Sequence, residues 1–436
     1  MNVPLFSVIM PTYNRGRHIL PSIQSVLRQT RQDFELLVVG DGCTDDTADV
    51  VRALASPQIR WLNLPERGGS QSFPNNAGIE MSRGQYIAYL GHDDIWASDH
   101  LQALADLFGH DPQPDFAVSG AIFHGPRASN YRLVTGIFSD GDAALTYFFP
   151  PSSFGHRRDV TDRIGKWRDP KKIVPPVDAD FLLRAAKSGM NFISTQRITV
   201  QKFAAGHRYL SYVSHTSDEQ ERMLRRMQRD GYEGYVASEL AKAKAANTFM
   251  INSYPDFTQY ENGQLAADSK LTRGLVRPDL RSLGQREVIK QDDSPKALDW
   301  CPLQASGGRI RWVGCNPRPK LLVPFKHAGR ARIRLDIWHP QGDALTRLKL
   351  SVNGQPVVTS ISKVRQEGNL WNALATFETA LQRDDPTILE LHLNRLQRPA
   401  GQRTGIGMAD IEVTPLGWRS AVAKGTQFIA KFLSTR

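Results

Sequence analysis

Short apolar segments alternate with segments of helical spacing at the start of the chain, and this alternation constrains the possible folds more than any other feature. Strands that alternate with helices over such distances are typical of a parallel, doubly wound sheet. We therefore expect an α/β domain with a mostly parallel, doubly wound sheet in the first part of the chain. The expected strands span 6–10, 34–39, 59–62 and 86–90, and the expected helices 16–29, 46–55 and 74–82.

A pair of carboxylates follows the last of these expected strands. The apolar run 86–90 stops at Gly91, and Asp93 and Asp94 come soon after it. Open α/β sheets bind ligands at the carboxyl ends of their strands, and a glycine permits the turn that lets two neighbouring Asp converge. The pair therefore either holds a cation, belongs to a solvated acidic loop, or caps the helix that follows.

The length of 436 residues is enough for two or three domains with buried cores. The 3 cysteines lack the CxxC spacing of a zinc site, which favours a reduced compartment without a disulfide framework. The N-terminus has no basic stretch followed by a long apolar one, so we expect no signal peptide. No apolar run reaches the ~18 residues of a spanning helix. These features predict a cytoplasmic protein.

The net charge of +11 comes from the C-terminal third of the chain. Residues 296–436 hold 21 Lys and Arg against 10 Asp and Glu, and the rest of the chain is neutral. Such a surface suits an anionic membrane, a polyanionic glycan or a nucleic acid. Because no helix-turn-helix, zinc-finger or RNA-binding signature accompanies it, we expect a membrane surface or a glycan as partner and no nucleic acid.

The pattern changes after residue 215. Residues 216–295 predict a helical segment, Ser217 to Asn252, and then a polar linker. The helical segment either packs on the first domain, 1–215, or makes an oligomer contact. Residues 296–416 alternate as strands do, and Asn353-Gly354 between two such runs is a strong hairpin signal. We predict an antiparallel β-sandwich there, serving either to bind glycan or as a structural appendage.

The last segment, 417–436, combines apolar residues at helical spacing with Lys and Arg. An amphipathic basic helix of this kind lies at the surface of an anionic membrane or docks on a neighbouring domain. The first alternative would make the protein a peripheral one at the inner face of the cell membrane. The sequence leaves both open.

Motifs within residues 5–215 resemble those of the family 2 glycosyltransferases, in the family's order and spacing. The motifs are FSVIMPTYNR, ELLVVGDGCTDDT, NNAGIEMSRGQYIAYLGHDDIW and VDADFLLRAAKSG. The resemblance implies the glycosyltransferase A-type fold. It also implies transfer of a sugar from a nucleotide-diphosphate donor to a hydroxyl, with inversion at the anomeric carbon.

The resemblance implies a role for individual residues. Asp178 is implied as the general base that takes the proton of the acceptor hydroxyl, opposite the leaving group. A Mn²⁺ or Mg²⁺ ion is implied as the Lewis acid for the departing pyrophosphate, with Asp93, Asp94 and His207 as its ligands. The implied substrate-binding residues are Pro11, Thr12, Tyr13, Asp41, Asp180 and Arg208.

Structural alternatives exist for several of these roles. Asp178 and Asp180 could cap the helix they open, and His207 could be an ordinary surface histidine. The chain also departs from the family at three positions that usually carry acidic residues, which are Gly40, Gly91 and Val177.

The sequence thus predicts an inverting, metal-dependent glycosyltransferase that acts on a glycan or a lipid-linked acceptor, in the synthesis of a bacterial surface polysaccharide. The rival hypothesis is a non-catalytic glycan- or nucleotide-binding protein on the same fold, which the three departures from the family favour. A nucleotidyltransferase of the same sheet type is disfavoured, because no glycine-rich loop with Lys or Arg follows the first strand. Donor sugar, acceptor and oligomeric state are left open.

Overall fold

The computed structural model divides the chain into two compact units, Met1–Leu275 and Val276–Arg436. The division falls inside the segment 216–295, so the helices predicted there belong to the first unit. The structure describes residues 3–110, 113–125, 132–139, 149–203, 211–212, 215–245, 248–249, 260–276, 279–289, 297–298, 311–312, 320–327, 329–383, 386–392 and 407–416.

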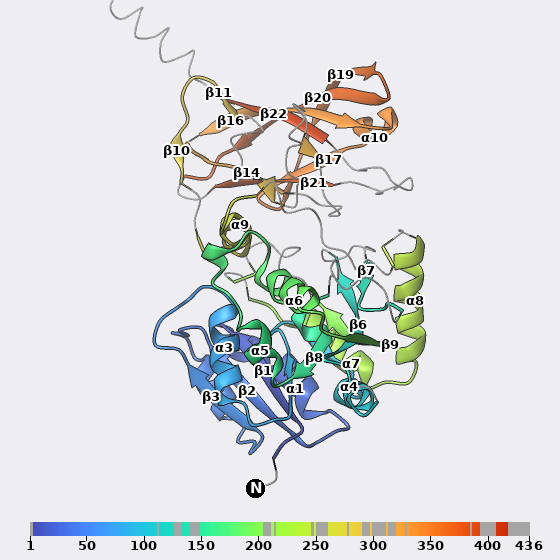
Figure 1. The fold of residues 1–436 in the computed structure, drawn as a ribbon. Helices are drawn as coiled ribbons and strands as arrows, with labels where there is room; N and C mark the ends of the chain where they lie inside the picture. The colour runs from blue at the N-terminus through green and yellow to red at the C-terminus, as the bar shows by residue number, and fades with distance from the viewer. Residues whose placement is uncertain are drawn as a thin grey trace, which may run out of the picture. The chain divides into compact units, whose positions relative to one another are not determined.

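A mixed β-sheet forms the centre of the first unit (Figure 1). Its strands are β1 (Phe6–Thr12), β2 (Phe34–Gly40), β3 (Ile59–Asn63), β4 (Tyr86–Tyr89), β5 (Ile95–Trp96), β6 (Phe116–His124), β7 (Arg132–Thr135), β8 (Phe154–Arg157) and β9 (Phe192–Lys202). They are ordered β3-β2-β1-β4-β8-β6-β9-β5, and β7 pairs with β6 outside this path. The first four strands of this order run parallel to one another. β8 is antiparallel to β4 and to β6, whereas β6 and β9 are parallel.

Helices cover both faces of this sheet, as the doubly wound prediction requires. Side chains alternate along a strand, so Val8 of β1 packs with one buried cluster and Ile9 with the other. The first cluster includes residues of α1, α2 and α4, and the second includes residues of α3, α5 and α6. The predicted α/β fold is confirmed. The helices are α1 (Leu20–Leu27), α2 (Thr47–Arg52), α3 (Ser72–Met81), α4 (His100–Phe108), α5 (Val160–Ile164) and α6 (Val177–Lys187), with 3-10 turns η1 (Gly16–Ile19), η3 (Pro151–Ser153) and η4 (Pro170–Lys172).

Three further helices belong to this unit: α7 (Asp218–Met227), α8 (Tyr232–Ala245) and α9 (Gln264–Arg273). α7 and α8 lie in the predicted helical segment, and Gly231 separates them with a φ of +86°. α9 lies in the stretch 253–295 that we predicted to be a linker, so that prediction is wrong for residues 264–273. The segment QLAADSKLTR is composed mostly of good helix formers, and the Gly and Pro residues that suggested a linker lie outside it.

The second unit is built from two antiparallel sheets, which confirms the predicted β-sandwich. One sheet has the order β11-β22-β16-β20-β19 with β13 beside β22, and the other β12-β14-β21-β17-β18; the short β10 pairs in parallel with β15. Asn353 and Gly354 have φ values of +49° and +80°, and they form the predicted hairpin between β17 and β18. The elements are β10 (Arg281–Ser282), β11 (Glu287–Ile289), β12 (Ala297–Leu298), β13 (Arg311–Trp312), β14 (Lys320–Val323), β15 (Phe325–Lys326), β16 (Arg330–His339), α10 (Gly342–Thr346), β17 (Lys349–Val352), β18 (Gln355–Val357), β19 (Ser360–Glu367), β20 (Leu370–Ala380), β21 (Thr387–His392) and β22 (Gly407–Pro415).

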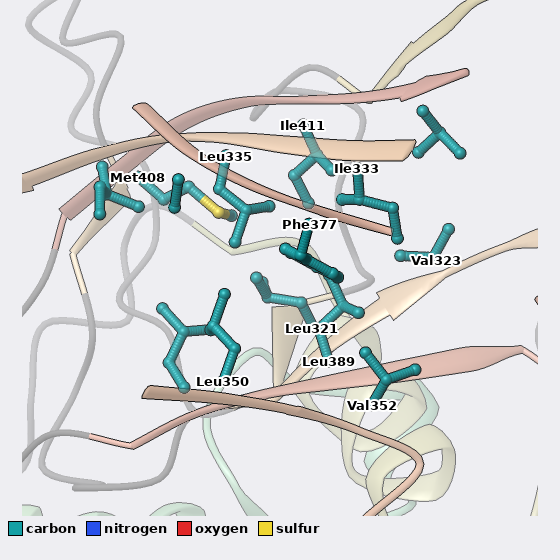
Figure 2. Close-up of a cluster of buried hydrophobic side chains, with 14 of the residues drawn as sticks. Leu321, Val323, Ile333, Leu335, Leu350, Val352, Phe377, Leu389, Met408 and Ile411 are labelled. Atoms are coloured by element: carbon teal, nitrogen blue, oxygen red, sulfur yellow. The ribbon is translucent and has the colours of Figure 1, made fainter. Parts of the chain in front are cut away.

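Apolar side chains from both sheets meet in the core of this unit (Figure 2). Leu335 of β16 is completely buried in this cluster, so truncation leaves a cavity. We expect Leu335→Ala to lower the free energy of unfolding of this unit by about 3 kcal/mol in denaturant titrations. The matched change Val364→Ala, on a side chain that is 38% exposed, should cost less than about 0.5 kcal/mol. Equal losses for the two variants would contradict this packing.

No helix in the part of the chain that the structure describes is long and apolar enough to cross a membrane. The predicted amphipathic helix over 417–436 lies outside the described residues. Its proposed contact with a membrane stays a prediction.

Candidate active site

Three parallel strands of the first unit end at the same edge of the sheet. β1 pairs with β2 so that Thr12 faces Gly40, and β1 pairs with β4 so that Ile9 faces Tyr89. The residues that follow these three strands therefore lie close together. This is the edge at which open α/β sheets bind ligands.

A pocket of about 390 Å³ opens at this edge. It brings together residues from motifs that are far apart in the sequence. Asp94 and Asp180, both described by the structure, are not among its lining residues, and His207 and Arg208 lie outside the described residues. The predicted site residues that line the pocket are Pro11, Thr12, Tyr13, Asp41, Asp93 and Asp178.

Asp41 is buried directly after β2, and it binds the backbone of the neighbouring glycine loop, Gly68-Gly69. Its two carboxylate oxygens accept hydrogen bonds from the backbone N–H of Gly68, at 2.8 Å, and of Gly69, at 2.7 Å. Burial raises the pKa of Asp41, and these two N–H groups act in the opposite direction. Each oxygen has a second lone pair, so the carboxylate can still accept a hydrogen bond from a ligand in the pocket.

Tyr13 presents an aromatic ring beside this loop. The guanidinium carbon of Arg67 lies 4.2 Å from the centre of the Tyr13 ring, a cation–π contact. The ring of Tyr212 also stacks against Tyr13, with 6.5 Å between the two ring centres. All three residues line the pocket.

The two adjacent carboxylates have different surroundings. Asp94 is completely buried, and its oxygens accept hydrogen bonds from Ser152 Oγ at 2.6 Å, Lys202 Nζ at 2.8 Å and the backbone N–H of Phe203 at 3.2 Å. Asp93 is half-buried and lines the pocket. Its carboxylate accepts no hydrogen bond from the described part of the chain. Asp93 is therefore the member of the pair that is open to a ligand.

Lys202, at the end of β9, supplies the positive charge next to this pair. Burial alone would lower the pKa of Lys202, but the carboxylates of Asp94 and Asp93 outweigh it and raise the pKa. Burial also opposes ionisation of Asp93, and neighbouring positive groups, including Lys202, nevertheless lower its pKa. Burial raises the pKa of Asp94, and its pairing with Lys202 acts in the opposite direction.

His92 is buried next to the acidic pair. Its Nδ1 lies 3.1 Å from the carbonyl oxygen of Pro11, and its Nε2 lies 3.1 Å from the hydroxyl of Tyr212. A carbonyl only accepts, so Nδ1 donates and Nε2 accepts from the hydroxyl. Burial lowers the pKa of His92 to about 3. The neutral ring therefore links the end of β1 to Tyr212.

Asp178 lies in the first turn of α6, and its side chain is half-buried in the pocket wall. The N-cap residue of α6 is Pro176. Asp178 is therefore not the N-cap of this helix. Burial raises the pKa of Asp178, although backbone N–H groups and the charges of Lys202 and Arg273 act in the opposite direction. A carboxylate with a raised pKa is a better proton acceptor than an ordinary one.

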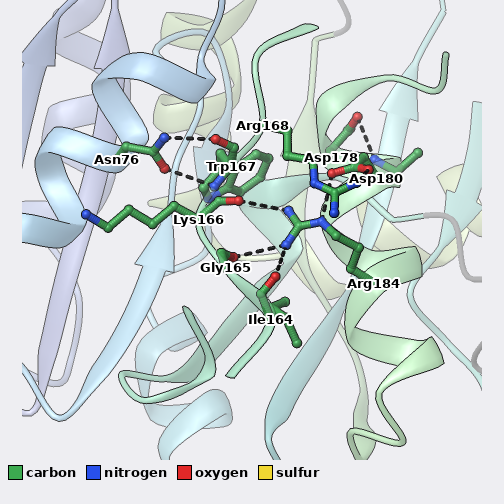
Figure 3. Close-up of polar contacts among 10 residues, drawn as sticks. Asn76, Ile164, Gly165, Lys166, Trp167, Arg168, Asp178, Asp180 and Arg184 are labelled. Carbon is green, nitrogen blue, oxygen red and sulfur yellow. Dashed lines mark hydrogen bonds and ion pairs between the residues drawn. The ribbon is translucent and has the colours of Figure 1, made fainter. Parts of the chain in front are cut away.

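Asp180 lies in the same first turn of α6 but outside the pocket, where two arginines pair with it (Figure 3). It pairs with Arg184 at 2.9 Å and with Arg168 at 3.4 Å. Arg184 also donates to the carbonyl oxygens of Gly165 and Lys166, at 3.0 and 2.9 Å. In this arrangement Asp180 ties α6 to the loop before it, and its predicted contact with substrate stays a prediction.

The same loop is fixed on its other side by Asn76, whose amide exchanges two hydrogen bonds with the backbone of Trp167 (Figure 3). The Trp167 ring stacks on Phe181 of α6 at 4.7 Å, and its Nε1 donates to Tyr89. Trp167 is thus a core residue.

The side chains of the pocket can be compared with the ligands that a divalent cation needs. Among the described residues no three His, Cys, Asp or Glu side chains come together as a ready metal site, and the oxygens of Asp94 already have partners. Mg²⁺ and Mn²⁺ are often held by only one or two carboxylates together with substrate phosphates. Asp93 alone, with a diphosphate beside it, is such a set. The roles of Asp94 and His207 as ligands stay predictions.

Sequence reasoning missed several residues that line the pocket, among them the polar residues Lys202, Tyr212, Lys270 and Arg273. Lys202 could have been recognised from the sequence, because a lone lysine at the end of the apolar run 198–203 is unexpected in a buried strand. Lys270 and Arg273 lie on α9, in the stretch predicted as a linker. Tyr212 had no signal that we can name.

The family model "Glycosyl transferase family 2" matches residues 7–165, which span β1 to α5. These residues form a family 2 glycosyltransferase domain. Curated proteins similar to it include an uncharacterized glycosyltransferase of Nostoc sp., 31% identical over 183 residues, which are 37% of this chain and 55% of that protein. Poly(ribitol-phosphate) beta-N-acetylglucosaminyltransferase TarP of Staphylococcus aureus is 32% identical over 154 residues, 34% of this chain and 45% of that protein.

The chain thus spans about half the length of these two curated relatives. Solved structures with some likeness include S. aureus TarS, at 12% identity and a TM-score of 0.40, covering 95% of this chain and 86% of that one. S. aureus TarS in complex with UDP-GlcNAc gives 19% identity and a TM-score of 0.39, covering 55% and 71% of the two chains.

Proposed function

We propose that this chain transfers a sugar from a nucleotide-diphosphate donor to a hydroxyl of a glycan or lipid-linked acceptor, with inversion at the anomeric carbon. The observation that carries the proposal is that Asp93 and Asp178 line one pocket, although 85 positions separate them in the sequence. Inversion needs these two functions in one cavity, a site for the leaving diphosphate and a base for the incoming hydroxyl.

The nucleoside end of the donor lies against the loop that follows β1 and β2. Tyr13 offers a ring face on which a base can stack, with Arg67 above it. Asp41 keeps lone pairs free beyond its two bonds to the glycine loop and can accept a base or ribose hydrogen bond. Pro11 and Thr12 line the same pocket.

The diphosphate lies next to Asp93, which would hold the divalent cation. When bound there, Mn²⁺ or Mg²⁺ would stabilise the negative charge that develops on the departing diphosphate. Lys202 keeps the neighbouring Asp94 paired, which leaves Asp93 free for this role.

Asp178 acts as the general base. Its carboxylate accepts the proton of the acceptor hydroxyl while the hydroxyl oxygen bonds to the anomeric carbon and the bond from that carbon to the diphosphate oxygen breaks. The raised pKa of Asp178 makes it a stronger base for this proton. The proton leaves later to solvent.

The acceptor class is supported by similarity and by charge. TarP, similar over residues of this domain, is named for transfer to poly(ribitol-phosphate), a polymer substrate. Together with the basic C-terminal third, this supports an acceptor in the synthesis of a bacterial surface polysaccharide, handled at the cytoplasmic face of the membrane.

A panel of nucleotide sugars tests the proposal. The full chain is mixed with UDP-, GDP-, dTDP- and CMP-linked sugars and Mn²⁺, and release of free nucleotide is measured. We expect release from one nucleoside-diphosphate donor and a loss of release in EDTA. Tight binding of a nucleotide sugar without any release would favour the non-catalytic alternative, and neither binding nor release from any donor would reject the proposal.

A further inference from the structure

One face of α9 forms part of the pocket wall. Its lining residues recur at helical spacing, which puts them on one side of the helix. α9 begins about a hundred residues beyond the end of the family match at residue 165, so the wall it forms lies outside that match. The lining residues of α9 are Leu265, Ala266, Ser269, Lys270 and Arg273.

Backbone hydrogen bonds hold both ends of this helix at the pocket. At its start, the N–H of Gly263 donates to the carbonyl of Ile173 at 3.0 Å, shortly before the turn that carries Asp178. At its end, the carbonyl of Arg273 accepts from the N–H of Tyr212 at 3.1 Å. The position of α9 over the cavity is therefore fixed by its backbone and does not depend on the side chains of Lys270 and Arg273.

Lys270 lies at the nucleoside end. A Cβ placed on Gly69 would stand 2.9 Å from Lys270 Nζ, so the ammonium lies directly over this glycine. The N–H of Gly69 bonds to Asp41 at 2.7 Å. Gly69 has a φ of +71°, a backbone conformation that favours glycine, and the absence of a side chain leaves space for the ammonium above it.

Arg273 lies at the opposite, catalytic end. Its guanidinium carbon is 5.7 Å from the centre of the Tyr212 ring, and the Tyr212 hydroxyl bonds to His92, the neighbour of Asp93. The charge of Arg273 contributes to the electrostatics of both Asp93 and Asp178. Lys270 thus lies near the glycine loop at Gly69, and Arg273 lies near the side chains proposed to act in catalysis. The two cations of α9 are at opposite ends of the space between these two parts of the pocket.

Lys270 and Arg273 differ from Lys202 in their partners among the described residues. Within the part of the chain that the structure describes, Lys270 and Arg273 form no ion pair with a carboxylate, whereas Lys202 is paired with Asp94 at 2.8 Å. Unpaired cations that face a cavity are suited to bind an anion. Of the donor's parts, the diphosphate spans the interval between nucleoside and anomeric carbon.

We propose that α9 is a clamp for the donor, in which Lys270 and Arg273 bind the diphosphate from the side opposite Asp93. This inference rests on the proposed function. It adds two protein cations to the diffusible one, and it makes recognition of the diphosphate partly independent of metal. A nucleoside diphosphate should therefore bind measurably in EDTA, and more tightly than the nucleoside alone.

Calorimetric titrations of the full chain test this clamp. The probes are UDP, GDP and dTDP, each with its nucleoside, all in EDTA at fixed ionic strength. For the diphosphate that the wild type binds, Arg273→Gln and Lys270→Gln should each raise Kd about tenfold or more. The nucleoside Kd should stay unchanged, and Arg273→Lys should restore part of the loss.

Arg229→Gln is the matched control, because it removes the same charge from an exposed arginine outside the pocket. Its Kd values should equal those of the wild type. Unchanged diphosphate affinity in both α9 variants would overturn the clamp while leaving the proposed function intact, and so would an equal loss of diphosphate and nucleoside binding. Lost transfer with unchanged diphosphate affinity would assign the cations to an anionic acceptor and overturn it too. If the wild type binds no diphosphate even with Mn²⁺, the proposed function fails together with the clamp.

Discussion

Replacing Asp178 with Asn should lower kcat for sugar transfer about a thousandfold, while the Kd for the nucleoside diphosphate changes little. The amide keeps the shape of the side chain but cannot take the acceptor proton, and a positioned base contributes about 10²–10⁴ in rate. Steady-state transfer assays and nucleotide titrations on the same preparation measure the two quantities. Asp162→Asn on α5, an exposed aspartate outside the pocket, is the matched control and should keep wild-type kcat.

The pH profile gives a second signature of the same residue. The base must be deprotonated to act, so kcat/KM should fall as the pH falls through the pKa of Asp178. Because burial raises this pKa, the acid limb should lie above the usual range of an aspartate, and Asp178→Asn should remove it. An unaltered acid limb in the variant, or a kcat close to that of the wild type, would assign the base to another group.

Replacing Asp93 with Asn should lower transfer at saturating Mn²⁺ by about a hundredfold or more. Metal stabilisation of a leaving group is worth several kcal/mol, and each 1.36 kcal/mol is a factor of ten. Asp93 offers the open carboxylate of the acidic pair, so its loss should also raise the Mn²⁺ concentration needed for half-maximal rate. Assays across a Mn²⁺ series measure both effects.

The control for this change is Asp106→Asn on α4, where the carboxylate is exposed and lies outside the pocket. Its Mn²⁺ dependence should match that of the wild type. If Asp93→Asn kept the wild-type Mn²⁺ dependence, the cation would have to be held elsewhere. The binding of nucleoside diphosphate in EDTA, which depends on α9, should survive the Asp93 change.

The main features of the fold were predictable because local patterns and tertiary structure agree in both units. The buried strands β1, β2 and β4 are short apolar runs that end in turn residues, and their parallel pairing places the following residues at one edge. In the second unit, the alternation in β16 and the Asn353-Gly354 turn specify an antiparallel sheet. Strand order beyond β4 could not be read from the sequence, because β8 enters the sheet between β4 and β6 from a distant segment.

Site residues that belong to recognisable motifs could be predicted from the sequence, whereas residues that reach the pocket only through tertiary contacts could not. Asp93 and Asp178 come from recognisable motifs, and they line one pocket. What distinguishes Asp94 from Asp93 is the arrival of Lys202 and Ser152 from two other elements, and periodicity contains no information about such contacts. Arg273 reaches the pocket only because α9 folds back over it, from a stretch whose polar composition suggested a linker.

The ion pair between Lys202 and Asp94 gives the acidic loop a permanent counter-ion of its own. Two neighbouring carboxylates would otherwise repel each other in a poorly solvated cavity. Because this cation belongs to the chain, the repulsion is compensated before any diffusible ion arrives. The acidic loop therefore needs no bound metal ion to hold its two carboxylates side by side.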